Sequence, residues 1–211
     1  MTIYLDLDGT VLDISQRYKN LFSDISGFSR TIGSEFWEYK KNGLSTKEIL
    51  SNYNFSKNQQ EIFQKDWFNL VEHPNFLKFD KVFPGVTQLF ESIYKTENLV
   101  VCTARQNREL VFEQLTNLKI VKFFKSILVT EKKSTKASLV QDHRESNTSN
   151  PYDFDWIVGD TFEDMDTGFN LGISTCAVLT GLTPVEKFKE LNNPPTWIKD
   201  SLSSFLHTLS A

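Results

Sequence analysis

Four aspartates follow two apolar runs of the sequence at close spacing. Asp6 and Asp8 come directly after an apolar run that begins at Ile3, while Asp160 ends a second such run and Asp164 lies four residues beyond it. Carboxylates that gather in one place repel one another unless a cation lies among them, and oxygen ligands with little His or Cys suit Mg²⁺. If the fold brings the two pairs together, the implied cofactor is therefore Mg²⁺.

A hydroxyl and an ammonium group can join these carboxylates in binding a phosphate. Thr103 ends an apolar run of its own, and Lys136 follows another. With backbone N–H groups at the turns, both can hold phosphate oxygens against the metal. An aspartate beside them can attack phosphorus in line to give an acyl phosphate, and a second carboxyl two residues on can protonate the leaving alkoxide. We therefore interpret Asp6 as the nucleophile and Asp8 as the general acid.

The segment after Pro84 alternates between apolar runs of strand length and stretches with helical spacing. This alternation predicts an α/β fold in which a parallel, doubly wound sheet of the Rossmann-like type carries helices on both faces. Ligands of such sheets bind outside the carboxyl ends of the strands, so the residues that end the strands are expected to form one site. The predicted strands are 3–6, 99–102, 126–129, 156–158 and 175–179, the predicted helices are 86–94, 108–118, one that begins near 135, 163–170 and 201–209, and the polar stretch 141–153 is predicted to be loop.

A different pattern occupies the block between residues 14 and 80. There the apolar residues recur at helical spacing, which predicts helices at 17–24, 34–41, 46–53 and 58–72. Eight apolar residues of the block can form a small core of their own: Phe22, Phe36, Trp37, Ile49, Leu50, Phe63, Trp67 and Leu70. The sequence thus predicts a Rossmann-like core domain of residues 1–13 and 81–211, with an all-helical domain of residues 14–80 inserted into it.

Composition narrows the class of protein. The 211 residues carry 23 Lys+Arg and 27 Asp+Glu, a formal charge of −4, which disfavours nucleic acid as a partner. With 39% hydrophobic and 24% charged residues, the chain is expected to fold into a globular core. No apolar run is long enough to span a bilayer and none resembles a signal peptide, so no membrane partner and a cytoplasmic location are expected. Cys102 and Cys176 lie in apolar runs and are expected to be buried, reduced thiols.

Four motifs in matching order resemble the haloacid dehalogenase superfamily of phosphohydrolases. The first motif is Asp6-Leu7-Asp8-Gly9-Thr10, and the second is a hydrophobic strand that ends in Thr103. The third is a lysine, and the fourth is Gly159-Asp160-Thr161-Phe162-Glu163-Asp164. The flanking glycines and the Pro84-Gly85-Val86 segment are similar to the pattern of the same superfamily. Together the motifs cover the chain almost from end to end.

The resemblance implies roles for these residues. Asp6 and Asp160 would bind Mg²⁺ through their side chains and Asp8 through its backbone carbonyl, while Asp164 would orient a metal-bound water. It also implies that the helical block is a mobile cap, similar to that of phosphoglycolate-phosphatase-like members, which closes over the core and contacts the substrate beyond its phosphate. The phosphate-binding residues would be Thr103, the following Ala104, and the lysine.

Two assignments leave alternatives open. Lys132, Lys133 and Lys136 all follow the third predicted strand of the core, and we choose Lys136 because it lies at the predicted start of a helix. The proline that usually follows the family lysine is absent. Arg105 comes soon after Thr103 and is a candidate substrate contact, with a surface salt bridge as the alternative.

These observations favour a Mg²⁺-dependent phosphatase that acts on a small phosphorylated metabolite, such as a phosphoglycolate-like or sugar-phosphate-like monoester, through an aspartyl-phosphate at Asp6. A phosphosugar mutase of the same superfamily would use the same residues. A non-catalytic phosphometabolite-binding module is the alternative from another class, although every acidic motif position is intact. Dehalogenases of the superfamily are disfavoured, since they lack the second aspartate that Asp8 supplies. The sequence selects neither the natural substrate nor an oligomeric state.

Overall fold

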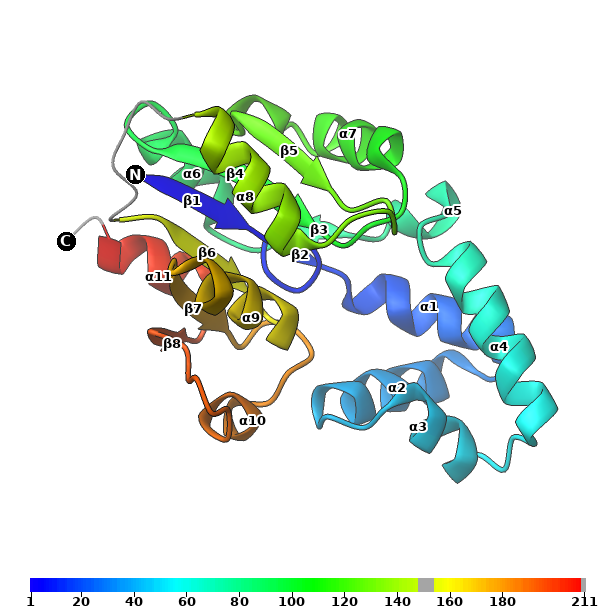
Figure 1. Cartoon of the computed structure of the whole chain (residues 1–211). Coiled ribbons are helices and arrows are strands. Elements are labelled where there is room, and N and C mark those ends of the chain that lie inside the picture. Colours follow the sequence, from blue (N-terminus) through cyan, green and yellow to red (C-terminus); the bar gives the residue numbers. More distant parts are fainter. Residues whose placement is uncertain (148–153, 210–211) are drawn as a thin grey trace. The chain divides into compact units, whose positions relative to one another are not determined.

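A computed structural model describes residues 1–147 and 154–209. Its contacts divide the chain into two compact units, one formed by Met1–Asp13 with Val82–Ala211 and the other by Ile14–Lys81. We call them the sheet unit and the helical unit (Figure 1). Each is described by itself.

The sheet unit is built on a parallel sheet, which has six strands within the part of the chain that the structure describes. Their order across the sheet is β5-β4-β1-β6-β7-β8, so the first strand of the chain lies in the middle. This arrangement confirms the predicted α/β class with a doubly wound sheet. The strands are β1 (Thr2–Leu5), β4 (Asn98–Thr103), β5 (Ser126–Val129), β6 (Trp156–Gly159), β7 (Ser174–Val178) and β8 (Trp197–Lys199).

Helices cover both faces of this sheet (Figure 1). On one face α8 packs against α9, and Val140 of α8 joins Tyr4, Val100 and Ile157 in one apolar cluster. On the other face α6 packs against α11, whose Phe205 contacts the ring of Trp156 at a centroid distance of 5.2 Å. The helices of the sheet unit are α6 (Val86–Ile93), α7 (Arg108–Asn117), the 3₁₀ turn η1 (Val121–Phe123), α8 (Lys136–Ser146), α9 (Phe162–Leu171), α10 (Val185–Lys189) and α11 (Leu202–Leu209).

Several short elements differ from the sequence expectation. Helix α8 runs to Ser146, so the prediction of loop from residue 141 was wrong for its first six residues, while 148–153 lie outside the described residues. The polar composition of that stretch concealed a helix whose outer face is solvated. The sequence also did not predict β2 (Leu12–Asp13), β3 (Lys81–Val82), α5 (Pro74–Leu77), α10 or β8, because elements of two to five residues are too short to show a period.

The helical unit contains α1 (Ser15–Ser26), α2 (Arg30–Lys41), α3 (Thr46–Asn52), α4 (Lys57–Leu70) and α5. Ser45 and Ser56 begin α3 and α4 with capping boxes, in which each serine and a Glu or Gln three residues later satisfy each other's backbone N–H groups. The core of the unit is aromatic, with the rings of Phe22 and Phe36 stacked at 4.2 Å between centroids. Of the eight core residues predicted from the sequence, six are buried, while Trp67, which packs against the core, and Leu70 are half-buried.

At Gly33, helix α2 packs closely against α1. A Cβ atom at this position would lie 2.5 Å from the carbonyl oxygen of Lys19 and 2.5 Å from the hydroxyl of Ser23. Gly33→Ala is therefore expected to push the two helices apart and to lower the free energy of unfolding by about 2 kcal/mol, a typical cost of overpacking. Urea denaturation followed by circular dichroism measures the change. Ser34→Ala, at an exposed position of the same helix, is the control, and equal stability of both variants would contradict the expectation.

Candidate active site

Strands β1, β4 and β6 bring the predicted site residues to one edge of the sheet. Leu5 is opposite Val101 on one side and Val158 on the other, so the residues that follow these strands meet at their carboxyl ends. Asp6 continues β1, and its backbone N–H donates to the carbonyl of Val158 at 2.9 Å. Thr103 ends β4, and Asp160 follows β6 directly.

Three carboxylates form a buried acidic cluster at this edge. One oxygen each of Asp6, Asp160 and Asp164 lie within 4.8 Å of one another, and all three side chains are buried. This spacing allows a single cation to be shared by oxygen ligands. The sequence joined these residues in one site, and the structure places them together.

Lys136 contributes a positive charge to the cluster. Its Nζ donates to Asp6 Oδ1 at 2.7 Å and to Asp164 Oδ1 at 2.6 Å, and the side chain is only 2% exposed. It is the first residue of α8, and Thr135 caps the helix, which fixes the backbone from which the ammonium extends. Lys132 and Lys133, the other two candidates, are both exposed side chains. Lys133 forms a surface ion pair with Glu131 at 3.6 Å. Geometry therefore favours Lys136 over both.

The pKa values in the cluster reflect burial and a shortage of positive charge. Burial raises the pKa of Asp6 to about 7, and the repulsion of Asp164 adds to this while Lys136 opposes it. Burial and the charges of Asp6 and Asp164 hold the pKa of Asp160 well above its usual range. Burial alone would lower the pKa of Lys136, yet the carboxylates of Asp164 and Asp6 raise it well above the ordinary value. One ammonium thus compensates only part of the negative charge, and a further cation would stabilise the site.

Asp160 offers an oxygen to such a cation. Its Oδ2 accepts the backbone N–H of Leu182 at 2.9 Å, whereas its buried Oδ1 has no hydrogen-bond partner among residues 1–147 and 154–209. Gly9 and Gly181 both approach this carboxyl so closely that a Cβ atom on either would collide with it, and Gly9 also has a positive φ of 82°. A buried carboxylate oxygen without a partner is costly, and a metal ion would satisfy it. The donor set therefore fits a hard divalent cation.

Asp164 is held from both sides. Oδ1 faces Lys136, and Oδ2 accepts the Oγ1 hydroxyl of Thr161 at 2.6 Å and the Thr161 backbone N–H at 3.2 Å. Thr161 is the N-cap residue of α9, so the aspartate lies in the first turn of that helix, where negative charge is favoured. A side chain at Gly159 would collide with Asp164, which explains the glycine before Asp160.

The other predicted site residues are Thr103, Ala104, Asp8 and Arg105. Thr103 is buried at the end of β4, with Ala104 half-buried after it. The carboxylate of Asp8 faces the buried guanidinium of Arg105, whose Nε donates to Asp8 Oδ2 at 3.0 Å and whose Nη1 donates to Gln114 at 3.0 Å. Arg105 thus forms a salt bridge with Asp8, which was the alternative to a substrate contact, but its own side chain is buried and does not lie on the surface.

Residues after β7 were missed by sequence reasoning. Thr180 donates its hydroxyl to the carbonyl of Gly9 at 2.6 Å, and the backbone of Gly181 and Leu182 packs on Asp160. The position of this loop could have been predicted, because it also follows the carboxyl end of a strand of the parallel sheet. It was missed because it contains no charged residue and no typical catalytic residue.

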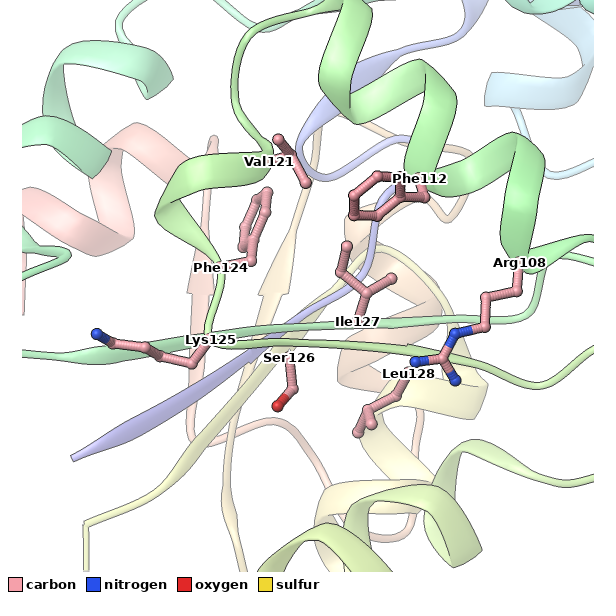
Figure 2. Close-up of a pocket in the computed structure, with 8 residues that line it drawn as sticks. All are labelled: Arg108, Phe112, Val121, Phe124, Lys125, Ser126, Ile127 and Leu128. Carbon is pink, nitrogen blue, oxygen red and sulfur yellow. The ribbon is translucent and has the colours of Figure 1, made fainter.

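A separate cavity of about 440 Å³ lies along the edge strand β5. Phe112, Phe124 and Ile127 line it on one side of the strand, and the aliphatic Leu128 and the hydroxyl of Ser126 lie on the other (Figure 2). None of the predicted site residues lines this cavity.

The comparisons with known proteins agree with the site. The family model described as haloacid dehalogenase-like hydrolase matches residues 3–178, and the chain belongs to this family. That span contains both acidic motifs, the lysine and Thr103. No match to a curated protein was found.

Solved structures show the same fold at low sequence identity. A candidate phosphatase from Clostridium difficile matches with a TM-score of 0.75 and 20% identity, covering 99% of this chain and 97% of the other. A haloacid dehalogenase-like hydrolase from Streptococcus pneumoniae matches with a TM-score of 0.72, 20% identity and the same coverage. YfnB from Bacillus subtilis, solved bound to magnesium and showing interdomain movement, matches with a TM-score of 0.66 and 18% identity over 100% of this chain and 98% of its own.

None of the helices in the described part of the chain combines the length and the apolar character that crossing a bilayer requires. Cys102 and Cys176 are buried, free thiols, as the sequence predicts. Burial raises the pKa of both thiols to about 12, which disfavours the thiolate form.

Proposed function

We propose that this chain is a Mg²⁺-dependent phosphatase that hydrolyses a small phosphorylated metabolite through an aspartyl-phosphate on Asp6. The observation that carries the proposal is the buried cluster in which Asp6 lies with Asp160 and Asp164 around Lys136. Membership of the haloacid dehalogenase-like hydrolase family supports the reaction class. The structural neighbours named as candidate phosphatases and the magnesium bound by YfnB support the substrate class and the metal.

The proposed reaction has two steps. A carboxylate oxygen of Asp6 attacks phosphorus, the new O–P bond replaces the bond to the leaving oxygen, and Asp8 gives that oxygen its proton. Water then attacks the phosphorus of the acyl phosphate and transfers a proton to Asp8. The O–P bond to Asp6 breaks, inorganic phosphate leaves, and both aspartates return to their starting states.

Three groups would hold the metal in this proposal. They are the side chains of Asp6 and Asp160, the latter through its unpartnered Oδ1, and the backbone carbonyl of Asp8. Bound Mg²⁺ supplies positive charge that neutralises the phosphate and the carboxylates together. Asp164, held by Thr161 and Lys136, would fix the water that completes the metal's ligand set.

The phosphate oxygens would be bound by the chain itself. Thr103 offers a hydroxyl, Ala104 offers a backbone N–H, and Lys136 offers a charge-assisted hydrogen bond. The helical unit would act as the cap that contacts the remainder of the substrate and keeps water out during transfer. A panel of phosphorylated sugars, phosphoglycolate and nucleotides, assayed for phosphate release, would identify the substrate.

Removal of the metal is expected to silence the protein without unfolding it. In excess EDTA Lys136 offsets only part of the negative charge of Asp6, Asp160 and the phosphate, whereas the apolar cores of both units are built without the metal. Phosphate release should fall to background, return on addition of Mg²⁺, and be accompanied by an unchanged circular dichroism spectrum. Full activity in EDTA, or loss of secondary structure on chelation, would contradict the proposed role of the metal.

A further inference from the structure

The carboxylate of Asp8 is bound at two points by one guanidinium. Arg105 Nε donates to Asp8 Oδ2 at 3.0 Å, and Nη2 donates to Oδ1 in a short, charge-assisted contact. The arginine side chain is 2% exposed, whereas that of Asp8 is 25% exposed. A buried arginine thus fixes the plane of a carboxylate that remains open to solvent.

Arg105 is itself held in place from two other elements. Its Nη1 donates to Oε1 of Gln114, a buried residue of helix α7, at 3.0 Å. Its backbone carbonyl accepts the N–H of Glu131, in the loop after β5, at 3.0 Å. The bond to Gln114 restrains the guanidinium and the bond from Glu131 restrains the backbone that carries it, so Arg105 is a firmly held support for Asp8.

The bonds to Arg105 leave the Asp8 carboxylate able to take part in proton transfer. Each carboxylate oxygen has two lone pairs, so an oxygen that accepts an N–H from Arg105 can still exchange a proton with a second partner. The side chain of an aspartate that immediately precedes a turn, as Asp8 does, would otherwise rotate between rotamers. A proton donor displaced by about 1 Å can cost about a hundredfold in rate, so a fixed orientation has a large kinetic value.

We propose that Arg105 is a positioning residue, which holds the Asp8 carboxylate in the orientation for proton transfer and does not itself contact substrate. The inference rests on the proposed phosphatase function and deepens it. If it is correct, the effect of Arg105 on turnover is transmitted through Asp8 alone. A substrate contact would act on binding instead.

A double-mutant cycle with p-nitrophenyl phosphate as substrate tests whether Arg105 affects turnover through Asp8. Its phenolate leaves without a proton, so Asp8 matters mainly in the second step, where it takes the proton from water. Arg105→Met is expected to lower kcat about tenfold or more, with KM within about twofold, and to give a burst of p-nitrophenolate as the acyl phosphate accumulates. In an Asp8→Asn background the same substitution should change kcat less than about twofold. Arg108→Met, at an exposed position of the same segment, is the matched control and should behave as wild type.

The cycle has outcomes that overturn the inference. An equal loss in both backgrounds, an unchanged kcat in Arg105→Met, or a raised KM alone would each exclude a positioning role. If Arg105→Met does not fold, Arg105→Lys serves in the same cycle, because it keeps the charge and loses the two-point geometry. Failure of the proposed function is seen separately, as absent phosphate release by the wild type or full activity of Asp6→Asn.

Discussion

Asp6→Asn should abolish phosphate release while the protein stays folded. An amide cannot form the acyl phosphate, and the substitution also removes a negative charge from the cluster that would hold the metal. The loss is expected to be at least about a thousandfold in kcat, as for the removal of other covalent nucleophiles. The measurement is a phosphate-release assay at saturating Mg²⁺ with the best substrate of the panel.

The melting temperature of Asp6→Asn shows whether a loss of activity reflects lost chemistry or an unfolded protein. Burial raises the pKa of Asp6 and so disfavours its charged form, and the neutral amide is therefore expected to be tolerated in the native state. Asp166→Asn is the matched control, because Asp166 lies on an exposed face of α9 and outside the acidic cluster. Near wild-type turnover by folded Asp6→Asn protein would exclude the aspartyl-phosphate mechanism.

Lys136→Ala is expected to lower kcat/KM by at least about a hundredfold. The ammonium group lies 2.7 Å from Asp6 and 2.6 Å from Asp164, so its removal leaves buried negative charge uncompensated as the phosphoryl group is transferred. It also removes the charge-assisted bond to the phosphate that we propose. Lys136→Met, which retains most of the side-chain volume, keeps the test valid if the alanine variant is unstable.

Lys132→Ala and Lys133→Ala are the controls for this position. Lys133 is 78% exposed and Lys132 is exposed beside it, and surface charges of this kind contribute little to rate or stability. Both variants should therefore retain wild-type kcat/KM. If one of them is crippled while Lys136→Ala is active, the assignment of the third motif is wrong.

The position of the acidic cluster could be predicted because it depends on topology. Parallel strands end at one edge of the sheet, so any residue directly after such a strand is brought there, as Asp6 and Asp160 are. The strands of the sheet could likewise be predicted from apolar runs, and the core of the helical unit from apolar residues at helical spacing. These properties follow from the local sequence.

The partners of the site residues could not be predicted, because they depend on side-chain packing between distant segments. The distance from Arg105 to Asp8 is set by how β4 and β1 pair and by Gln114 on the following helix. The bond from Leu182 to Asp160 requires the path of a loop with no charged residues. The sequence also underestimated α8, since a solvated helix with few apolar residues resembles a loop in composition.

Trapping of the phosphorylated protein tests the central claim most directly. The protein is mixed with radiolabelled substrate, quenched in acid within one turnover, reduced with borohydride to convert an acyl phosphate into a stable alcohol, and mapped by peptide mass spectrometry. We expect the label to be bound covalently before reduction and the modified residue to be Asp6, with none in Asp6→Asn. A phosphatase that turns over without a labelled intermediate, or that carries the modification at another residue, would contradict the account.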